Sequence, residues 1–356
     1  SRGGGVDQPH QFLDRPPDRR VALALVGLDV EARLVGLECL ALVLEAPRAA
    51  EYVVVLEQVA VVLHTLNGDW TKLQISGMLG IFGDCGVVVT EVVDCGFSAD
   101  RQVAELDRLI AAKPDAIVAL PVANEQVVAA FRRVSAAGIR LVLLENVPTG
   151  LLPGSHYTSL VSSDNFGLGR MAAAGLAPHL AQGAAVGVLG FAADFFATNE
   201  REIAFTNWMQ ANRSDVRTHV LRFGTMDEAA DLAERMIADH PEISGFFVVW
   251  DTPATAVSTR LQATGRSIVM ATVDLGEDVA ISLAAGKPFV SVAAQQPFQQ
   301  GVVAARTTIL ALLGRTIPAW IALPGVPVAR DNVADSFQIV WRKPAPREVL
   351  RSLGLT

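Results

Sequence analysis

Residues 115–144 read DAIVALPVANEQVVAAFRRVSAAGIRLVLL, and this stretch decides the fold. Two apolar runs of strand length, 116–120 and 140–144, enclose a segment, 125–137, whose apolar residues recur at helical spacing. Gly138 follows that segment, and glycine is the residue that most often ends a helix. A strand, a helix and a second strand in this order predict parallel strands joined by a crossover helix.

The same alternation extends in both directions from this unit. Upstream, strands are predicted at 59–65 and 87–93, with helices around 75–82 and 102–111. Downstream, strands are predicted at 157–161, 185–189, 218–222, 245–250, 268–273 and 289–293, and late strand material at 336–341. The helices between them are predicted at 164–180, 199–211, 226–239, 252–263, 277–284 and 298–313. The predicted fold class is therefore α/β, with two doubly wound lobes that each contain a parallel sheet.

The first 56 residues are predicted to be a leader or extension outside the two lobes. Residues 1–20 combine a Gly-Gly-Gly run with adjacent prolines, as flexible leaders do. Residues 21–50 are apolar, but their charged residues lie too close together for a membrane span. Three interpretations stay open: a degenerate export signal, a helical extension, or a leader added by a misassigned start.

Composition excludes several classes of protein. The chain has 356 residues, of which 51% are hydrophobic, and this is enough for two globular domains. Its net charge of -8 argues against a nucleic-acid groove, which normally carries a basic footprint. Three cysteines, Cys39, Cys85 and Cys95, are too few for a disulfide framework, although a bridge between Cys85 and Cys95 stays open.

Signatures of catalysis and of metal binding are absent from the sequence. It contains no G-x-S-x-G, H-E-x-x-H or Walker A motif, and none of its six histidines has a partner at metal-ligand spacing. Residues 167–172 fit G-x-G-x-x-A, but the next strand ends without the acid that would bind a ribose. We therefore predict a protein that is not an enzyme, with no catalytic residues, no metal and no cofactor.

Candidate ligand-binding residues follow the ends of the predicted strands, where ligands gather in open α/β sheets. They combine carboxylates, amides, a guanidinium and aromatic rings: Asn67, Asp69, Trp70, Glu145, Asn146, Phe195, Asn199, Arg201, Trp250, Asp274 and Gln295. The polar groups suit paired hydroxyls, and the rings suit the C–H face of a sugar. This set predicts a sugar or polyol ligand.

Residues 57–343 resemble the ribose-type periplasmic solute-binding proteins, whose fold is shared by the effector domains of lac-repressor-type regulators. The segments that carry the resemblance are Asn67-Gly-Asp69-Trp70, Asp115–Pro121, Ser163-Asp164-Asn165, Asn199-Glu-Arg201, Trp250-Asp251, Val273-Asp274 and Gln295-x-Pro297. The resemblance implies the type I periplasmic binding protein fold, in which three hinge crossings join two lobes that close over a ligand.

This resemblance also implies boundaries for the lobes. Crossings are expected near 161–164, 294–296 and 323–327. The N-terminal lobe would then comprise 57–162 plus 296–325, and the C-terminal lobe 163–295 plus 326–343, followed by a tail at 344–356.

Four positions depart from the family pattern, and each loses a polar contact or gains apolar surface. Glu145-Asn146 stand where the family often has Arg, and Asn199 replaces the first Arg of a later pair. Trp250 and Leu120 each replace a common Asn. A pocket without these donors discriminates against a fully hydroxylated pentose, so we expect a deoxy, methylated, aryl-bearing or otherwise less polar ligand.

The favoured function is the solute-binding component of an ABC sugar-type transporter. It would act as a periplasmic or extracellular monomer that presents its ligand to an ABC permease or sensor receptor, with no nucleic acid and no direct membrane span. The alternative is the ligand-sensing module of a periplasmic receptor or of a lac-repressor-like regulator, which would be cytoplasmic. Residues 21–50 do not show the helix-turn-helix that such a regulator carries.

Overall fold

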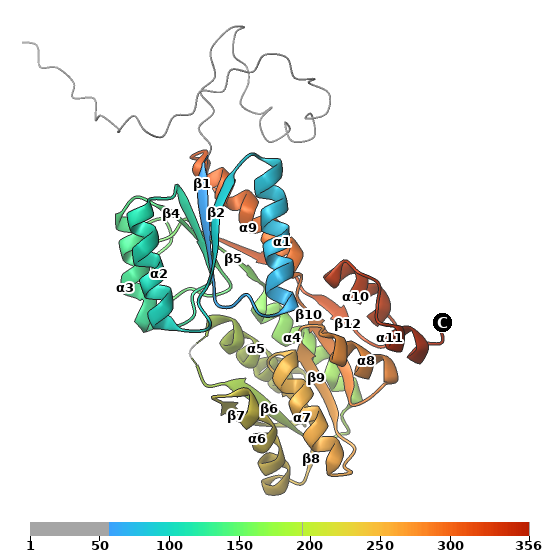
Figure 1. Cartoon of the computed structure of the whole chain (residues 1–356). Helices are drawn as coiled ribbons and strands as arrows, with labels where there is room; N and C mark the ends of the chain where they lie inside the picture. Colours follow the sequence, from blue (N-terminus) through green and yellow to red (C-terminus); the bar gives the residue numbers. More distant parts are fainter. Residues whose placement is uncertain (1–56, 194, 356) are drawn as a thin grey trace, which may run out of the picture. The chain divides into compact units, whose positions relative to one another are not determined.

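The computed structural model describes residues 57–193 and 195–355, so the predictions for residues 1–56, Cys39 included, lie outside the described residues. The described chain contains two six-stranded sheets, each in its own lobe (Figure 1). In the N-terminal lobe the strand order is β11-β5-β4-β3-β1-β2, and in the C-terminal lobe it is β12-β10-β9-β8-β6-β7. This confirms the predicted fold class.

The N-terminal sheet consists of β1 (Gln58–Leu63), β2 (Val88–Asp94), β3 (Ala116–Ala119), β4 (Arg140–Leu144), β5 (Ser159–Ser163) and β11 (Trp320–Leu323). Its helices are α1 (Asp69–Asp84), α2 (Ala99–Ala112), α3 (Glu125–Ala136) and α9 (Pro297–Leu312). The C-terminal sheet consists of β6 (Ala185–Phe191), β7 (Arg217–Phe223), β8 (Ile243–Val248), β9 (Val269–Val273), β10 (Phe289–Ala294) and β12 (Val326–Val328). Its helices are α4 (Asn165–Leu176), α5 (Phe196–Asn212), α6 (Met226–Asp239), α7 (Asp251–Ala263), α8 (Glu277–Ala285), α10 (Val333–Trp341) and α11 (Arg347–Ser352), with a short 3₁₀ helix at Ala177–His179.

Helices cover both faces of the N-terminal sheet, α1 and α9 on one side and α2 and α3 on the other (Figure 1). The central strand β1 shows why its sequence is almost continuously apolar. Val59, Val61 and Leu63 pack in the core under α1 and α9, whereas Ala60 and Val62 pack in the core under α2 and α3. Because successive side chains point to opposite faces, a strand buried on both sides needs apolar residues at every position.

A close helix contact ties α9 to α1. A Cβ atom on Gly301 would lie 2.0 Å from the carbonyl oxygen of Gln74, far inside van der Waals contact. Only glycine lets the two backbones approach this closely. The contact matters for function because α9 begins directly after a crossing between the lobes.

The chain crosses between the sheets at three places. Strand β5 ends at Ser163 and α4 begins at Asn165; β10 ends at Ala294 and α9 begins at Pro297; β11 ends at Leu323 and β12 begins at Val326. These three segments fall where the crossings were expected. All strand pairs are parallel except β12, which pairs antiparallel with β10.

The C-terminal end of the chain differs from the prediction. Residues 336–341, predicted as strand material, belong to helix α10, whose buried residues Val333, Ser336, Phe337 and Val340 recur at helical spacing. The β-branched and aromatic residues of SFQIVW suggested a strand, but packing on one face decides for a helix. The predicted tail contains α11, whose Val349 is buried in the C-terminal core.

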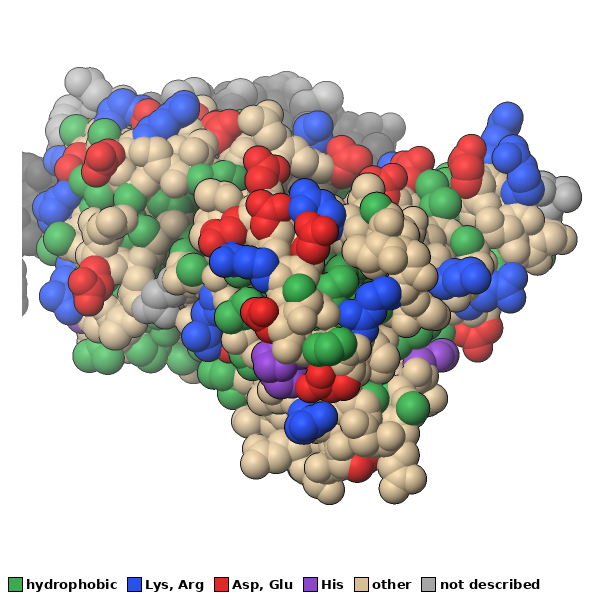
Figure 2. Space-filling view, turned by 90° about the horizontal axis from the view of Figure 1, so that it is seen from below, with side chains coloured by type: hydrophobic (Ala, Val, Ile, Leu, Met, Phe, Trp, Pro, Cys, Tyr) green, Lys and Arg blue, Asp and Glu red, His purple; other side chains and the backbone are tan. Residues whose placement is uncertain are grey.

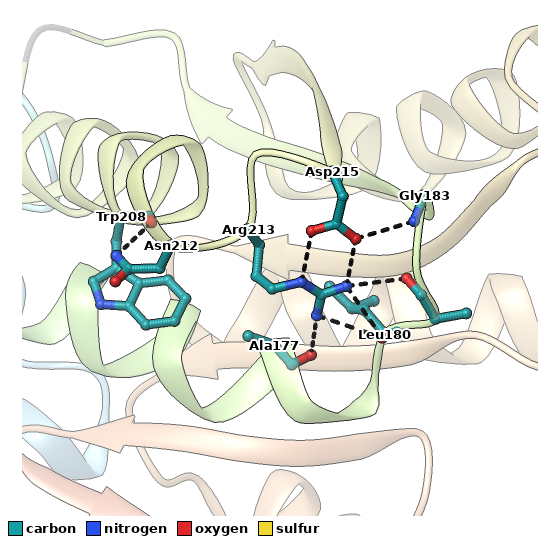
Figure 3. A network of polar contacts seen from close by, with 8 residues as sticks. Ala177, Leu180, Gly183, Trp208, Asn212, Arg213 and Asp215 are labelled. Atoms are coloured by element: carbon teal, nitrogen blue, oxygen red, sulfur yellow. Dashed lines mark hydrogen bonds and ion pairs between the residues drawn. The ribbon is translucent and has the colours of Figure 1, made fainter.

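Polar contacts also fix the far side of the C-terminal lobe. Arg213, at the end of α5, donates hydrogen bonds to the carbonyls of Ala177 (2.6 Å) and Ala181 (3.1 Å) and pairs with Asp215 (2.9 Å) (Figure 3). Asp215 in turn accepts a hydrogen bond from the amide of Gly183 (3.0 Å). We call these residues the Arg213 clamp, and it joins the end of α5 to the segment that follows α4, adding side-chain donors to two carbonyls that also accept backbone amides.

Three features of the described residues bear on the classes of protein considered from composition: surface charge, helix length and the cysteines. Figure 2 shows one face of the molecule, on which acidic and basic side chains are interspersed. No helix among the described residues has both the length and the apolar character that a membrane crossing requires. No disulfide joins Cys85 to Cys95, and burial raises the pKa of the Cys95 thiol to about 11, which leaves it unreactive.

Candidate ligand-binding cleft

Two adjoining hollows lie where the carboxyl ends of the strands of both lobes meet. Their volumes are about 400 Å³ and about 520 Å³. The residues that line both are His64, Trp70, Phe97, Trp250, Asp274 and Gln295. His64 follows β1 in the N-terminal lobe, while Asp274 follows β9 in the C-terminal lobe. The two hollows therefore form one cleft to which both lobes contribute.

The two hollows differ in chemistry. The smaller, which we call the polar hollow, adds Asn67, Asp69, Asp251, Thr252, Glu277 and Lys343. The larger, which we call the apolar hollow, adds Leu120, Val122, Phe191, Phe195 and Met226, together with Glu145, Asn146 and Arg201. An elongated ligand with a polar and an apolar end would match this division.

Aromatic rings from both lobes face this cleft. In the N-terminal lobe the rings of His64 and Phe97 meet edge to face, with centroids 5.0 Å apart. In the C-terminal lobe Phe191 meets Trp250 in the same way at 5.2 Å. Phe97 is 63% exposed and lies at a φ of 57°, a left-handed conformation that costs energy for a bulky residue. Exposed, strained aromatic residues of this kind are typical of a binding surface.

Asp274 and Gln295 connect the cleft to a crossing. The amide nitrogen Nε2 of Gln295 donates to Oδ1 of Asp274 (2.7 Å), and its Oε1 accepts from the hydroxyl of Ser163 (2.6 Å). Gln295 and Ser163 belong to two different crossing segments. A ligand that binds Asp274 therefore contacts a network that continues into the hinge.

Glu145 occupies the centre of that hinge network. Its carboxylate accepts hydrogen bonds from the backbone amide of Ser163 (2.9 Å), from Nδ2 of Asn165 (3.3 Å) and from Nε2 of Gln300. The side chain is only 5% exposed. Although Glu145 lines the apolar hollow, its oxygens are already engaged by the crossings, so it is placed to position the hinge.

Arg201 is also partly engaged by the protein. Its Nε donates to Oδ1 of Asn165 (2.9 Å), and its Nη1 donates to the carbonyl of Val249 (3.2 Å). The residue is 4% exposed. A planar guanidinium that is held in this way presents its remaining N–H groups to the cleft in a fixed direction.

Burial raises the pKa of two carboxylates in the cleft and lowers the pKa of its histidine. Burial and the nearby Asp274 raise the pKa of Asp251 to about 7. Burial likewise raises the pKa of Asp274, although Arg201 opposes this effect. Burial lowers the pKa of His64 to about 4, so its ring is neutral at pH 7. In each case the loss of water disfavours the charged form.

All predicted ligand-binding residues except Asn199 line the cleft. Asn199 lines a separate surface hollow with Glu202, Ile203 and Arg222. Asn199 and Arg201 are two residues apart on α5, and residues at that spacing point to nearly opposite sides of a helix. Asn199 therefore lies on another side of α5 than Arg201, in a hollow that shares Phe191 and Ala193 with the apolar hollow, and its role in ligand binding stays a prediction.

Several cleft residues were not among the predicted set. Phe97 follows β2 and Phe191 ends β6, so their place at strand ends is a signal in the sequence that marks both. Trp341 and Lys343 reach the polar hollow because α10 is a helix, and Trp341 is held there by a hydrogen bond from its Nε1 to the carbonyl of Leu275 (2.6 Å). His64 and Asp251 also stand at the ends of predicted strands, and this position in the sequence was sufficient to predict that both line the cleft.

Comparison with known proteins gives three kinds of match. The family model described as a periplasmic binding protein domain matches residues 59–316. The ribose import binding protein of Bacillus subtilis (strain 168) is 26% identical over 233 residues, which is 65% of this chain and 74% of that protein.

The solved structures show a similar fold. An ABC transporter solute-binding protein from Agrobacterium vitis, bound with alpha-D-tagatopyranose, matches with a TM-score of 0.73 at 22% identity, covering 82% of this chain and all 100% of that one. A second from Agrobacterium vitis, with bound allitol, matches with a TM-score of 0.67 at 23% identity, covering 79% of this chain and 98% of that one. A third from Agrobacterium radiobacter, in complex with D-arabinose, matches with a TM-score of 0.71 at 15% identity, covering 80% and 99%.

Proposed function

This chain belongs to the periplasmic binding protein domain family, and we propose that it is the solute-binding component of an ABC importer for a sugar-derived or polyol ligand. The observation that carries the proposal is the cleft itself. Polar side chains and aromatic rings from both lobes meet at the point where three segments connect the lobes. Among the similar proteins, one is named for ribose import, and three solved structures contain tagatose, arabinose or allitol.

The mechanism needs no covalent chemistry. A ligand that contacts both lobes stabilises the closed arrangement because its affinity for that arrangement is higher. The hinge network of Glu145, Gln295 and Ser163 couples the cleft to two crossings, so closure and binding use the same groups. The family consists of binding proteins, and the ligand should leave the cleft unchanged.

We propose that the ligand is less polar than ribose. Leu120 and Trp250 add apolar surface where donors would otherwise stand, and the apolar hollow continues beyond them to Phe195 and Met226. Hydroxyls at one end of the ligand would bind Asp274, Gln295 and Asn67. A deoxy, methyl or aryl group at the other end would occupy the apolar hollow.

Thermal-shift and calorimetric screening tests this proposal. The panel should pair ribose, tagatose and allitol with deoxy sugars and with methyl and phenyl glycosides of the same sugars. We expect the less polar partner of each pair to raise the melting temperature more, because a ligand stabilises the state that binds it. A preference for the fully hydroxylated partners would contradict the ligand class, and no binding across the panel would contradict the function.

Export to the periplasm or the cell exterior, delivery to an ABC permease and a monomeric state belong to the same proposal. Light scattering with and without ligand tests the monomer. Mass spectrometry of the recovered ligand tests whether it is unchanged. A ligand that returned chemically altered would favour an enzyme instead.

A further inference from the structure

A cluster of three metal-ligating side chains lies in the C-terminal lobe, away from the cleft. His219 belongs to β7, His240 follows the end of α6, and Glu242 directly precedes β8. One ligand atom from each lies within 4.8 Å of the other two. Gly224 and Met226, beyond the opposite end of β7, line the cleft, so the cluster is at the other edge of the sheet.

Both imidazole rings are directed at the same carboxylate oxygen. Nε2 of His219 lies 3.8 Å from Oε1 of Glu242, and Nδ1 of His240 lies 3.9 Å from it. Two ligand atoms on a tetrahedral zinc ion are about 3.3 Å apart, given bonds of about 2.0–2.1 Å. The two distances to Glu242 would have to shorten by about half an ångström, and no pair of the three atoms, which lie within 4.8 Å of one another, would have to close by more than about 1.5 Å. Side-chain rotations can supply movements of this size.

The cluster contains a polar atom that the protein leaves unsatisfied. Nε2 of His219 is buried and has no hydrogen-bond partner among the described residues. The two rings stack with centroids 3.7 Å apart and planes inclined at 28°. An ion lies in the plane of each imidazole that binds it, so one ring would have to rotate out of this stack when an ion binds. A buried nitrogen without a partner costs free energy, and an ion bound there would remove that cost.

A positively charged side chain beside the cluster would compete with an ion for the carboxylate of Glu242. Nη2 of Arg217 lies 3.5 Å from the same Oε1 of Glu242. The arginine side chain is 67% exposed, so it can move into solvent without losing a buried contact. Two imidazoles and one carboxylate form a donor set that suits Zn²⁺ and related divalent transition metals better than Ca²⁺ or Mg²⁺.

We propose that His219, His240 and Glu242 bind a Zn²⁺ ion on the C-terminal lobe, independently of the ligand cleft. The three side chains leave a fourth position for water, as an exposed three-ligand site does. The ion would link the edge strand β7 to the α6–β8 connection, two segments that are separate in the sequence. It would therefore stabilise the outer edge of the C-terminal sheet.

Isothermal titration with ZnCl₂ tests the site, using the full chain without a polyhistidine tag and after removal of metal by dialysis against EDTA. We expect one saturable ion per chain and a melting temperature that rises with zinc concentration. Substitution of Co²⁺ should give the visible absorption of a tetrahedral ion. H219A and H240A should each weaken zinc binding at least about 10-fold, as the loss of one of three ligands implies.

Two further variants keep the test specific. H179A removes an exposed histidine of the same lobe outside the cluster, and it should bind zinc as the wild type does. R217A removes the cation that competes for Glu242, and it should tighten binding a few-fold. The proposal is overturned if the wild type shows no saturable zinc binding, or if H219A and H240A bind zinc as tightly as the wild type.

Discussion

The two walls of the cleft are built differently. The N-terminal wall carries the rings of His64, Trp70 and Phe97 with Leu120, and its acidic side chains are Asp69, which is 68% exposed, and Glu145, which the hinge engages. The C-terminal wall also has aromatic rings, and it holds the carboxylates of Asp251 and Asp274 and the guanidinium of Arg201. Because of this difference, we expect the C-terminal lobe to supply most of the charged groups that recognise the ligand and the N-terminal lobe to cover it.

The largest effect should come from Asp274, because it faces both hollows. D274N should weaken binding of the tightest sugar in the panel by about 5- to 150-fold, since it replaces an acceptor oxygen with an amide donor and leaves a buried ligand hydroxyl unpaired, which costs about 1–3 kcal/mol. Asn is suited to the test because Asp274 has a φ of 73°, a conformation that Asn tolerates. Calorimetry measures the loss, and H179A, whose histidine lines neither hollow, is the control that should bind normally. Equal affinity in D274N would contradict the assignment of polar recognition to this wall.

The aromatic rings allow the same substitution to be compared in both walls, and we expect a smaller effect on binding. W70A and W250A remove one indole from each lobe, and each should weaken binding by about 2- to 12-fold, as expected for the loss of about 0.5–1.5 kcal/mol of ring contact. If the N-terminal wall closes last, W70A should mainly raise the dissociation rate, which stopped-flow fluorescence measures. If W70A lowered only the association rate, Trp70 would contact the ligand early, and the N-terminal wall would not close last.

Leu120 allows the apolar character of the N-terminal wall to be reversed. L120N should improve ribose binding by about 2- to 10-fold and weaken binding of phenyl glycosides, because one neutral hydrogen bond contributes about 0.5–1.5 kcal/mol. Calorimetry with both ligands gives the ratio of affinities. L120A, which removes apolar contact without adding a donor, should weaken the glycoside and leave ribose unimproved. Improved ribose binding in L120A would show that space, and not polarity, sets the preference.

The two walls should also differ in how the free energy of unfolding depends on pH. Asp251 keeps a proton in the folded state from its ordinary pKa of 3.8 up to about 7, so its contribution makes the free energy of unfolding fall as pH rises through that range. His64 is deprotonated in the folded state from about 4 up to its ordinary pKa of 6.5, so its contribution makes the same free energy rise.

Denaturant unfolding of D251N and H64Q between pH 4 and 7 separates these two contributions. Relative to the wild type, D251N should gain stability as pH rises, and H64Q should lose it. The two difference curves therefore have opposite slopes. Difference curves whose slopes have the same sign would contradict the opposite pKa shifts of Asp251 and His64.

Much of the fold was predictable because it depends on local patterns. The buried runs in β1, β3 and β4 had to be apolar at every position. Asp274 and Gln295 were predictable for the same reason, because the carboxyl end of a parallel strand is a place that the sequence marks. The crossings were expected from the family resemblance. The misassigned α10 shows the limit, since SFQIVW suits a strand until its packing face is known.

The period of apolar residues along the chain determined the two α/β lobes and the strand ends where most polar residues of the cleft lie, and the family resemblance implied the three crossings. Only the tertiary structure decided that Asn199 lines another hollow than Arg201, that Glu145 is engaged by the hinge, and that His219, His240 and Glu242 meet at one sheet edge. These outcomes depend on the direction of side chains and on contacts between distant segments, which spacing along one chain does not specify.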